Sequence, residues 1–142
     1  MKYVYPAIFT LDKTDASFPD GVYLVEFPDL EGCYTFGETL EKAYEMAEDV
    51  LNLTLWDLEE NKVQIPTPSN LKDLKCDENS FASLVSADTL AYRKLHDTKA
   101  VKKTLSIPRW LDTIAQERGV NFSNILQQAL MKELNVSAPK HA

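Results

Sequence analysis

Residues 22–43 read VYLVEFPDLEGCYTFGETLEKA, and this stretch decides the fold of the first part of the chain. Residues 22–27 are rich in β-forming side chains and follow the turn dipeptide Asp20-Gly21, so they predict a strand. Glu31-Gly32 then turns the chain into a second predicted strand at residues 33–36. Beyond it, the spacing of apolar residues changes from two to three and four, which marks the start of a helix.

An amphipathic pattern covers residues 38–60. Apolar residues recur there at three- and four-residue steps, so we expect one helix from Glu38 to about Glu60. Glu38 and Glu41 have the spacing of a capping box, although Glu is a poor residue for the cap itself. An acidic helix face is usually a solvated surface and does not by itself predict a binding site. The acidic residues that predict such an outer face are Glu41, Glu45, Glu48, Asp49, Asp57 and Glu59.

The segments on either side complete the first predicted domain. Residues 3–10 predict a strand in which Pro6 indicates a sheet edge or an irregularity. With the two strands described above, it would form an antiparallel meander. Residues 65–70, IPTPSN, predict an extended connection, because proline cannot continue a helix. A fourth strand is expected at residues 81–86, and a short helix from residue 88 to about residue 96.

Residues 101–136 have a different design. Their first segment, VKKTLSI at residues 101–107, predicts a strand of alternating polarity. Leu105 and Ile107 lie on one face of this strand. The other face carries Lys102, Thr104 and Ser106.

Two short helices are expected after this strand. Pro108 suits the first turn of a helix, where its missing N–H costs nothing. Gly119 can end that helix in the left-handed conformation, and Asn121 can cap the next one. One strand and two short helices bury too little apolar surface alone, so this segment should need a second copy to form a core.

The net charge of −7 hides a strong asymmetry along the chain. Residues 1–92 contain 18 acidic residues and 6 lysines, a net charge of −12, whereas residues 93–142 contain 9 basic and 4 acidic residues, a net charge of +5. An acidic front and a basic back predict different partners for the two halves. The polar stretch at residues 96–99 places the expected boundary between a domain of residues 1–97 and a domain of residues 98–142.

The cellular setting is expected to be the cytoplasm. No run approaches the roughly 18 apolar residues that cross a membrane, and the first residues lack the features of a signal peptide. Cys33 and Cys76 do not form a metal or disulfide pattern, so we expect reduced thiols.

Two stretches resemble known families. Residues 27–43, FPDLEGCYTFGETLEKA, resemble the FPDLPGCYTxGDTLEEA signature of HicB antitoxins, and residues 65–69, IPTPS, are similar to that family's IPxPS segment. Residues 103–108 and 119–126, KTLSIP and GVNFSNIL, resemble the ribbon-helix-helix consensus, a DNA-binding module that HicB proteins often carry at the C-terminus. The departures from these patterns are Glu31 for Pro, Glu38 for Asp, and Ser106 where many ribbon-helix-helix proteins have Arg.

The resemblance implies an α+β protein in two parts. The first would be a partial ribonuclease-H-like fold of antiparallel strands plus a helix, and the second a ribbon-helix-helix dimerisation and DNA-binding domain. It implies an antitoxin that inhibits a HicA-like mRNA-cleaving toxin and binds palindromic operator DNA as a dimer to repress its own operon. The expected assembly is a homodimer through the C-terminal domain, and a heterotetramer with the toxin.

The residues expected to bind DNA follow from the paired ribbon. Two protomers would form an antiparallel two-stranded ribbon, which the major groove of DNA admits. Lys102, Thr104 and Ser106 would face the base edges, and Lys103 would add electrostatic attraction to phosphates. The start of the second helix would offer free N–H groups to a phosphate, at Phe122, Ser123 and Asn124.

The acidic front suits a toxin that must be basic to grip RNA. The residues expected to contact it are Phe27, Pro28, Asp29, Leu30 and Tyr34. An equally weighted alternative is that these residues form a turn and pack into the core. A different function, a ligand-sensing ribbon-helix-helix repressor without a toxin, also remains open. A small basic reading frame beside the gene would favour the antitoxin.

Catalysis is not expected, and neither is a metal or a cofactor. A two-metal nuclease on a ribonuclease-H-like fold needs convergent carboxylates, normally including one in the first strand, and residues 3–10 contain none. Cys33 lacks an identifiable histidine partner and is expected to pack rather than react. The remaining candidates, which share no spacing motif or fall on the surface, are Glu26, Glu48, Asp88, His96 and His141.

Overall fold

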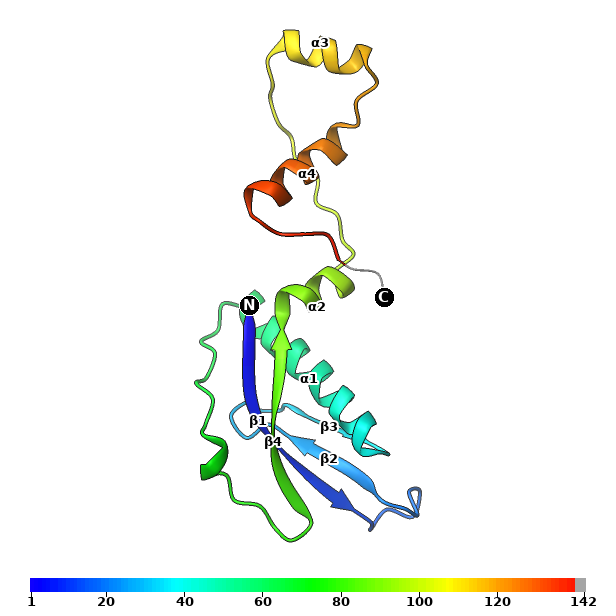
Figure 1. The fold of residues 1–142 in the computed structure, drawn as a ribbon, viewed down its shortest axis with the longest axis vertical. Helices are drawn as coiled ribbons and strands as arrows, with labels where there is room; N and C mark the ends of the chain where they lie inside the picture. Colours follow the sequence, from blue (N-terminus) through cyan, green and yellow to red (C-terminus); the bar gives the residue numbers. More distant parts are fainter. Residues whose placement is uncertain (140–142) are drawn as a thin grey trace. The chain divides into compact units, whose positions relative to one another are not determined.

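The computed structural model describes residues 1–139, which form two compact units (Figure 1). The first unit is Met1–Arg93, and the second begins at Lys94. The chain is a mixed α+β protein with one four-stranded sheet. Its elements are β1 (Lys2–Asp12), β2 (Val22–Glu26), β3 (Tyr34–Gly37), α1 (Leu40–Glu60), the 3-10 turn η1 (Leu71–Asp73), β4 (Ser80–Asp88), α2 (Thr89–His96), α3 (Arg109–Glu117) and α4 (Phe122–Glu133).

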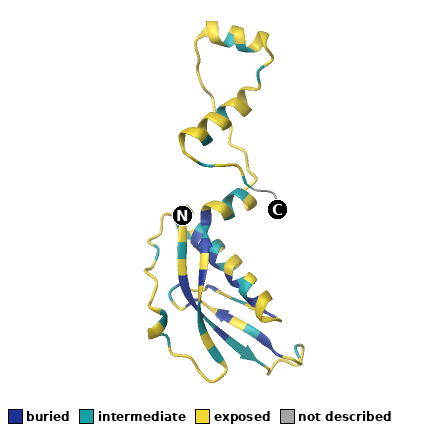
Figure 2. Ribbon diagram, viewed as in Figure 1, coloured by how far each residue is buried: buried dark blue, intermediate teal, exposed yellow. Residues whose placement is uncertain are grey.

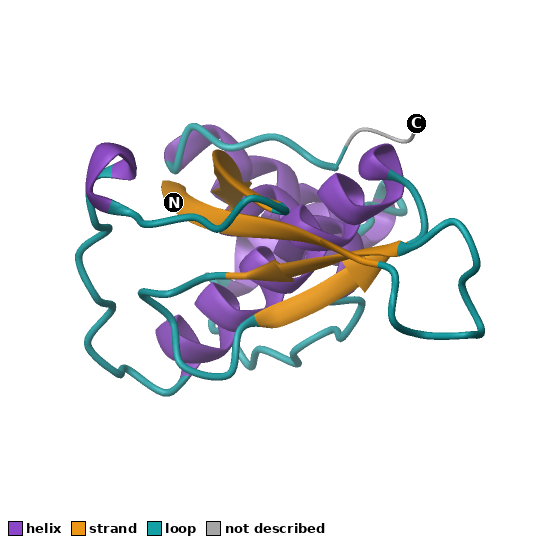
Figure 3. Cartoon of the chain, turned by 90° about the horizontal axis from the view of Figure 1, so that it is seen from below, coloured by secondary structure: helices purple, strands orange, loops and turns teal. Residues whose placement is uncertain are grey.

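The sheet of the first unit, drawn in orange in Figure 3, has the strand order β3-β2-β1-β4, and every pairing in it is antiparallel. The expected meander of β1, β2 and β3 is therefore confirmed, and β4 lies on the other side of β1. Strand β1 is central, but its pairing with β2 begins only at Ile8, whereas its pairing with β4 runs from Lys2 to Thr10. At Pro6, β1 is therefore paired only with β4. This part of β1 is a local edge of the sheet, as expected for a strand that contains proline.

Helix α1 covers one face of this sheet. Side chains alternate along a strand, so the odd-numbered residues of β1 face the helix. Leu51 and Leu55 are fully buried against them, and burying a leucine contributes roughly 1.5–3 kcal/mol. Buried residues concentrate on the strands and on α1 (Figure 2). The core residues shared by the helix and the two central strands are Tyr5, Ala7, Phe9, Val25, Ala43, Ala47, Leu51 and Leu55.

The start of α1 differs from the prediction. Its cap is Thr39, whose Oγ1 accepts a hydrogen bond of 3.1 Å from the backbone N–H of Lys42, and not Glu38. Threonine prevails because its short side chain reaches the free N–H groups of the first turn. Gly37 allows the chain to enter the helix closely, since a Cβ there would lie 2.3 Å from the backbone nitrogen of Ala43. The acidic outer face of α1 is exposed, as expected, except at Glu59, which is partly buried.

The second unit has no comparable core. Across its described residues, no side chain of α3 or α4 is buried (Figure 2). Gly119 ends α3 with a φ of +64°, and Asn121 caps α4, both as predicted. The strand predicted at residues 101–107 is not formed, because a strand is defined by pairing and a single copy of the chain supplies no partner for it. No helix within residues 1–139 combines the length and apolar character that crossing a membrane requires.

Candidate protein-binding and DNA-binding surfaces

The face of the sheet that α1 does not cover carries large exposed apolar side chains. We call it the open sheet face. Pairing places Leu24 beside Phe36, so these two side chains lie next to one another across the strands. Leu84 on β4 is paired with Pro6, which is itself buried. Tyr34 and Phe36 retain 71% and 53% of their surface, respectively. Apolar patches of this kind mark interaction sites in soluble proteins. The open sheet face consists of Val4, Ile8, Leu24, Tyr34, Phe36 and Leu84.

The sequence did not reveal this face, because its members are spread over four strands. Along each strand, they alternate with buried residues, as in strands that have one face on the core and the other toward solvent. Only the strand order brings Leu84 of β4 and Leu24 of β2 to the same surface. Tyr34 is the one member that had been identified as a binding candidate.

The loop at residues 27–33 places its five candidate residues differently. Phe27 and Leu30 are only 1% and 3% exposed, so the expectation that they contact a partner directly is corrected. Three backbone hydrogen bonds of 3.0–3.2 Å fold this loop tightly and turn both side chains into the core. Pro28 and Tyr34 are exposed, and Asp29 is partly exposed.

Asp29 joins two segments that lie far apart in the sequence. One carboxylate oxygen accepts a hydrogen bond of 2.9 Å from the backbone N–H of Ser69, and the other accepts the Ser69 hydroxyl. Nearby, the Tyr5 hydroxyl donates to the carbonyl of Pro66, and burial raises the pKa of Tyr5. The IPTPS segment at residues 65–69 is thereby fixed to the loop at residues 27–33.

We expect Asp29→Ala to destabilise the chain by about 1 kcal/mol, because two hydrogen bonds to a charged acceptor are lost at a partly exposed site. Urea unfolding followed by circular dichroism measures this change. Glu31→Ala removes a carboxylate from the same loop at an exposed position and should change stability by less than about 0.5 kcal/mol. Equal effects of the two substitutions would show that the Asp29–Ser69 contact does not stabilise the loop.

A polar cluster fixes α2 to α1 at the end of the first unit. Glu59 accepts hydrogen bonds from Tyr3, Thr89 and Arg93 at 2.9, 2.8 and 2.9 Å. Burial would raise the pKa of Glu59, but these three hydrogen bonds lower it overall. Burial and the bond to Glu59 raise the pKa of Tyr3 to about 12. Arg93 also donates a hydrogen bond of 2.6 Å to Glu60, so α2 is held to the first unit as far as Arg93.

The candidates for catalysis are dispersed. Glu26 points to the open sheet face, whereas Glu48 is on α1, the helix that covers the opposite face of the sheet. Burial raises the pKa of the Cys33 thiol, and a hydrogen bond from Thr54 only partly opposes this. In the described residues, no three His, Cys, Asp or Glu side chains are grouped closely enough to hold a metal ion. His141 lies outside the described residues.

The predicted DNA-binding residues lie in the second unit. Lys102, Lys103, Thr104 and Ser106 are all exposed. At the start of α4, the N–H of Asn124 donates to the Asn121 side chain at 3.0 Å. That cap occupies the N–H of Asn124, one of the three N–H groups that were expected to bind a phosphate.

An open apolar groove runs along the second unit and has a volume of about 740 Å³. Leu105 and Ile107, the apolar face of the segment at residues 101–107, line it together with residues of both helices. These side chains stay exposed: Leu105 retains 63% of its surface. The other large apolar residues of the groove are Leu111, Ile114, Phe122, Ile125 and Leu126.

Comparisons with known proteins identify relatives of the whole chain. The family described as HicB-like antitoxin of bacterial toxin–antitoxin systems matches residues 5–139. A chain of a toxin–antitoxin complex from Streptococcus pneumoniae is 35% identical, with 94% of this chain and 99% of that chain covered and a TM-score of 0.62. The antitoxin HicB of Burkholderia pseudomallei is 25% identical over 92% of this chain and 97% of that chain, with a TM-score of 0.47. A comparison with curated proteins found no match.

Proposed function

The chain belongs to the family of HicB-like antitoxins of bacterial toxin–antitoxin systems, and we propose that its first unit binds and inhibits a basic, HicA-like toxin that cleaves mRNA. The main support for this proposal is that one folded unit has both a net negative charge and an exposed apolar sheet face. The first unit contains 18 acidic and 7 basic residues. Acidic surroundings attract a basic partner and speed encounter, and the apolar face supplies the contact area.

The toxin contact is assigned to the open sheet face, with Tyr34 as its most exposed aromatic residue, and to the exposed Pro28 in the loop before it. Tyrosine is a frequent anchor at protein interfaces because its ring is large and its hydroxyl stays hydrated. Phe27 and Leu30 support the loop from inside. This role is one of binding in the cytoplasm, without catalysis, a metal or a cofactor. The strand order and helix of this unit support the partial ribonuclease-H-like fold proposed for it.

The second unit is proposed to be a ribbon-helix-helix domain that dimerises and binds the palindromic operator of its own operon. Two observations support this proposal. No side chain of α3 or α4 is buried within one copy, among the described residues, and Leu105 and Ile107 line an apolar groove. A second copy would pair the two segments at residues 101–107 and fill both grooves. Lys102, Thr104 and Ser106 would then point away from the core toward DNA, with Lys103 and the N–H groups of Phe122 and Ser123 at phosphates.

We expect Phe36→Ser to weaken toxin binding at least tenfold, because truncating a large aromatic anchor residue of an interface typically costs about 2 kcal/mol or more. Titration calorimetry of the full chain with the purified protein of the neighbouring basic reading frame measures the change. Leu53→Ser is the matched control, since Leu53 is 51% exposed on α1, which covers the opposite face of the sheet. Equal losses from both substitutions, or none from Phe36→Ser, would move the interface away from this face.

A further inference from the structure

The edge of β4 that faces away from β1 is unpaired. In the described residues, β1 is the only strand that pairs with β4. Backbone hydrogen bonds at the two ends of this ladder join odd-numbered residues: the N–H of Leu11 donates to the carbonyl of Asn79 at 2.9 Å, and the N–H of Thr89 donates to that of Met1 at 3.0 Å. Bonded and non-bonded pairs alternate in an antiparallel ladder. The N–H groups of Ala82, Leu84 and Ser86 therefore point to the free edge.

The residue opposite Leu84 agrees with this assignment. It is Pro6, which has no N–H to give to β4. On the free edge, the carbonyl of Leu84 accepts a hydrogen bond of 3.1 Å from the Tyr44 hydroxyl. Within the described chain, no partner is found for the N–H groups of Ala82, Leu84 or Ser86. The edge is thus able to accept a further strand.

This edge lacks the usual protection. Proteins commonly guard exposed edges with lysine, proline or inward-pointing charges. Strand β4, SFASLVSAD, contains no proline, and its only charged residue is Asp88 at its end. A second copy of the chain is disfavoured as the occupant, because the first unit is strongly acidic and two such units repel one another at short range. A basic segment is attracted to the same edge.

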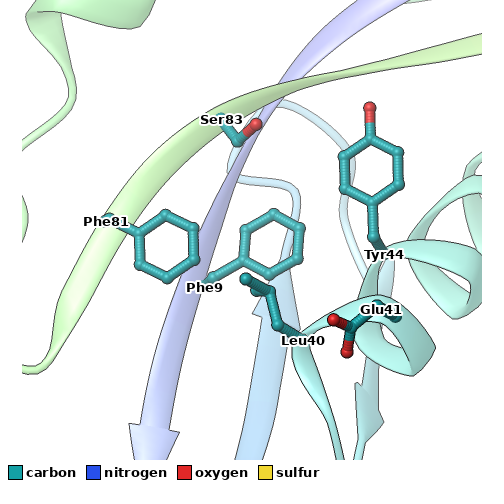
Figure 4. Close-up of a pocket in the computed structure, with 6 residues that line it drawn as sticks. All are labelled: Phe9, Leu40, Glu41, Tyr44, Phe81 and Ser83. Atoms are coloured by element: carbon teal, nitrogen blue, oxygen red, sulfur yellow. The ribbon is translucent and has the colours of Figure 1, made fainter.

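A pocket of about 480 Å³ opens beside the edge, on the side of the sheet that α1 covers (Figure 4). The rings of Phe9 and Phe81 stack at 5.2 Å, and the ring of Tyr44 stacks on Phe9 at 6.2 Å. Glu41 lines the pocket and forms no ion pair with any of the described residues. Aromatic walls with one carboxylate suit the stem and the charged head of an arginine or lysine side chain. Leu40 and Ser83 complete the lining.

We infer that a basic, extended segment of the toxin adds a strand to the free edge of β4 and places an arginine or lysine side chain in the pocket at Glu41. Side chains alternate along the added strand, so every second one lies beside Phe81 and Ser83, on the pocket side. The intervening side chains continue the open sheet face next to Leu84. The inference rests on the proposed toxin binding and names the edge where that binding begins.

Amide exchange of the full chain, followed residue by residue by NMR, tests the added strand directly. The N–H groups of Ala82, Leu84 and Ser86 should exchange rapidly in the free chain and at least tenfold more slowly in the complex with the purified protein of the neighbouring basic reading frame. The N–H groups of Phe81 and Ser83 point to β1 and should be protected in both states. Rapid exchange of the three edge amides in the saturated complex overturns the inference. Protection that grows with the concentration of the free chain assigns the edge to a second copy and also overturns it.

Two substitutions test the same geometry by affinity. Ser86→Pro removes an outward N–H and places a ring on the edge, so toxin affinity should fall at least tenfold. Glu41→Gln removes the pocket charge and should lower affinity about tenfold, whereas Glu48→Gln, the same change on the same helix outside the pocket, should stay within twofold. If neither Ser86→Pro nor Glu41→Gln weakens binding while Phe36→Ser does, the toxin binds elsewhere on the first unit and only this inference is wrong. If the unsubstituted chain binds no toxin, the proposed function fails as well.

Discussion

Leu105→Lys should convert a dimeric chain into a monomer and abolish operator binding. Leu105 is 63% exposed in one copy and lines the apolar groove of the second unit. In the proposed dimer, it packs against the other protomer, where an unpaired lysine would be buried at a cost of several kcal/mol. The described residues of this unit bury no side chain of α3 or α4 on their own, so no separate core could hold the fold together. A loss of pairing should therefore melt the ribbon and remove DNA binding completely.

Sedimentation equilibrium and operator binding across a salt series measure these two effects together. Lys102→Ala is the matched control, because Lys102 lies on the opposite face of the same segment. It should leave the dimer intact, weaken operator binding, and lower the salt dependence by about one ion per protomer if it contacts a phosphate. A Leu105→Lys protein that remains dimeric and binds the operator would contradict the ribbon-helix-helix assignment.

The first unit could be predicted well because its signals are local. The β-forming residues at positions 22–27, the three- and four-residue spacing along α1 and the turn dipeptides are each signals that extend over only a few residues. The strand order and the pairing partner of β4 depend on contacts between distant segments. The Asp29–Ser69 bond spans 40 residues, and its carboxylate carries no local mark of that role. Asp29, which was expected to contact the toxin, therefore has a structural role that the sequence did not reveal.

For the candidate binding residues, the sequence does not show which side chains are buried and which are exposed. Phe27 and Tyr34 both belong to the signature, yet one is 1% exposed and the other 71%. No pattern separates them, because a tight turn reverses the direction of the chain between them and only the fold determines which side chain points inward. The ribbon segment shows the opposite case. Lys102, Thr104 and Ser106 alternate clearly with Leu105 and Ile107 in the sequence, but no strand forms there in a single copy of the chain, because a strand needs a pairing partner.

A chain that ends after Asp97 should keep toxin binding and lose operator binding entirely. This end point retains all four strands, α1 and α2, and with them the cluster in which Glu59 binds Thr89 and Arg93. The truncated chain should unfold cooperatively, since the core lies wholly within the first unit. Its contacts with the toxin are unchanged, whereas the avidity that a dimer adds is lost. Operator binding should disappear because residues 98–142 are absent.

Two measurements for both chain lengths test this separation of roles: rescue of cells from the toxin, and operator binding in vitro.

A control chain that ends after Asp88 lacks Thr89 and Arg93, which leaves the partly buried Glu59 with only Tyr3 as a donor. It should be less stable to urea than the chain that ends after Asp97, because a partly buried carboxylate has lost two charge-assisted hydrogen bonds. If the folded chain ending at Asp97 fails to bind the toxin while residues 98–142 alone bind both toxin and DNA, the toxin contact belongs to the second unit and the assignment of roles is wrong. Rescue only by the full chain would instead place toxin contacts on both units, because neither unit alone would then hold the complete interface.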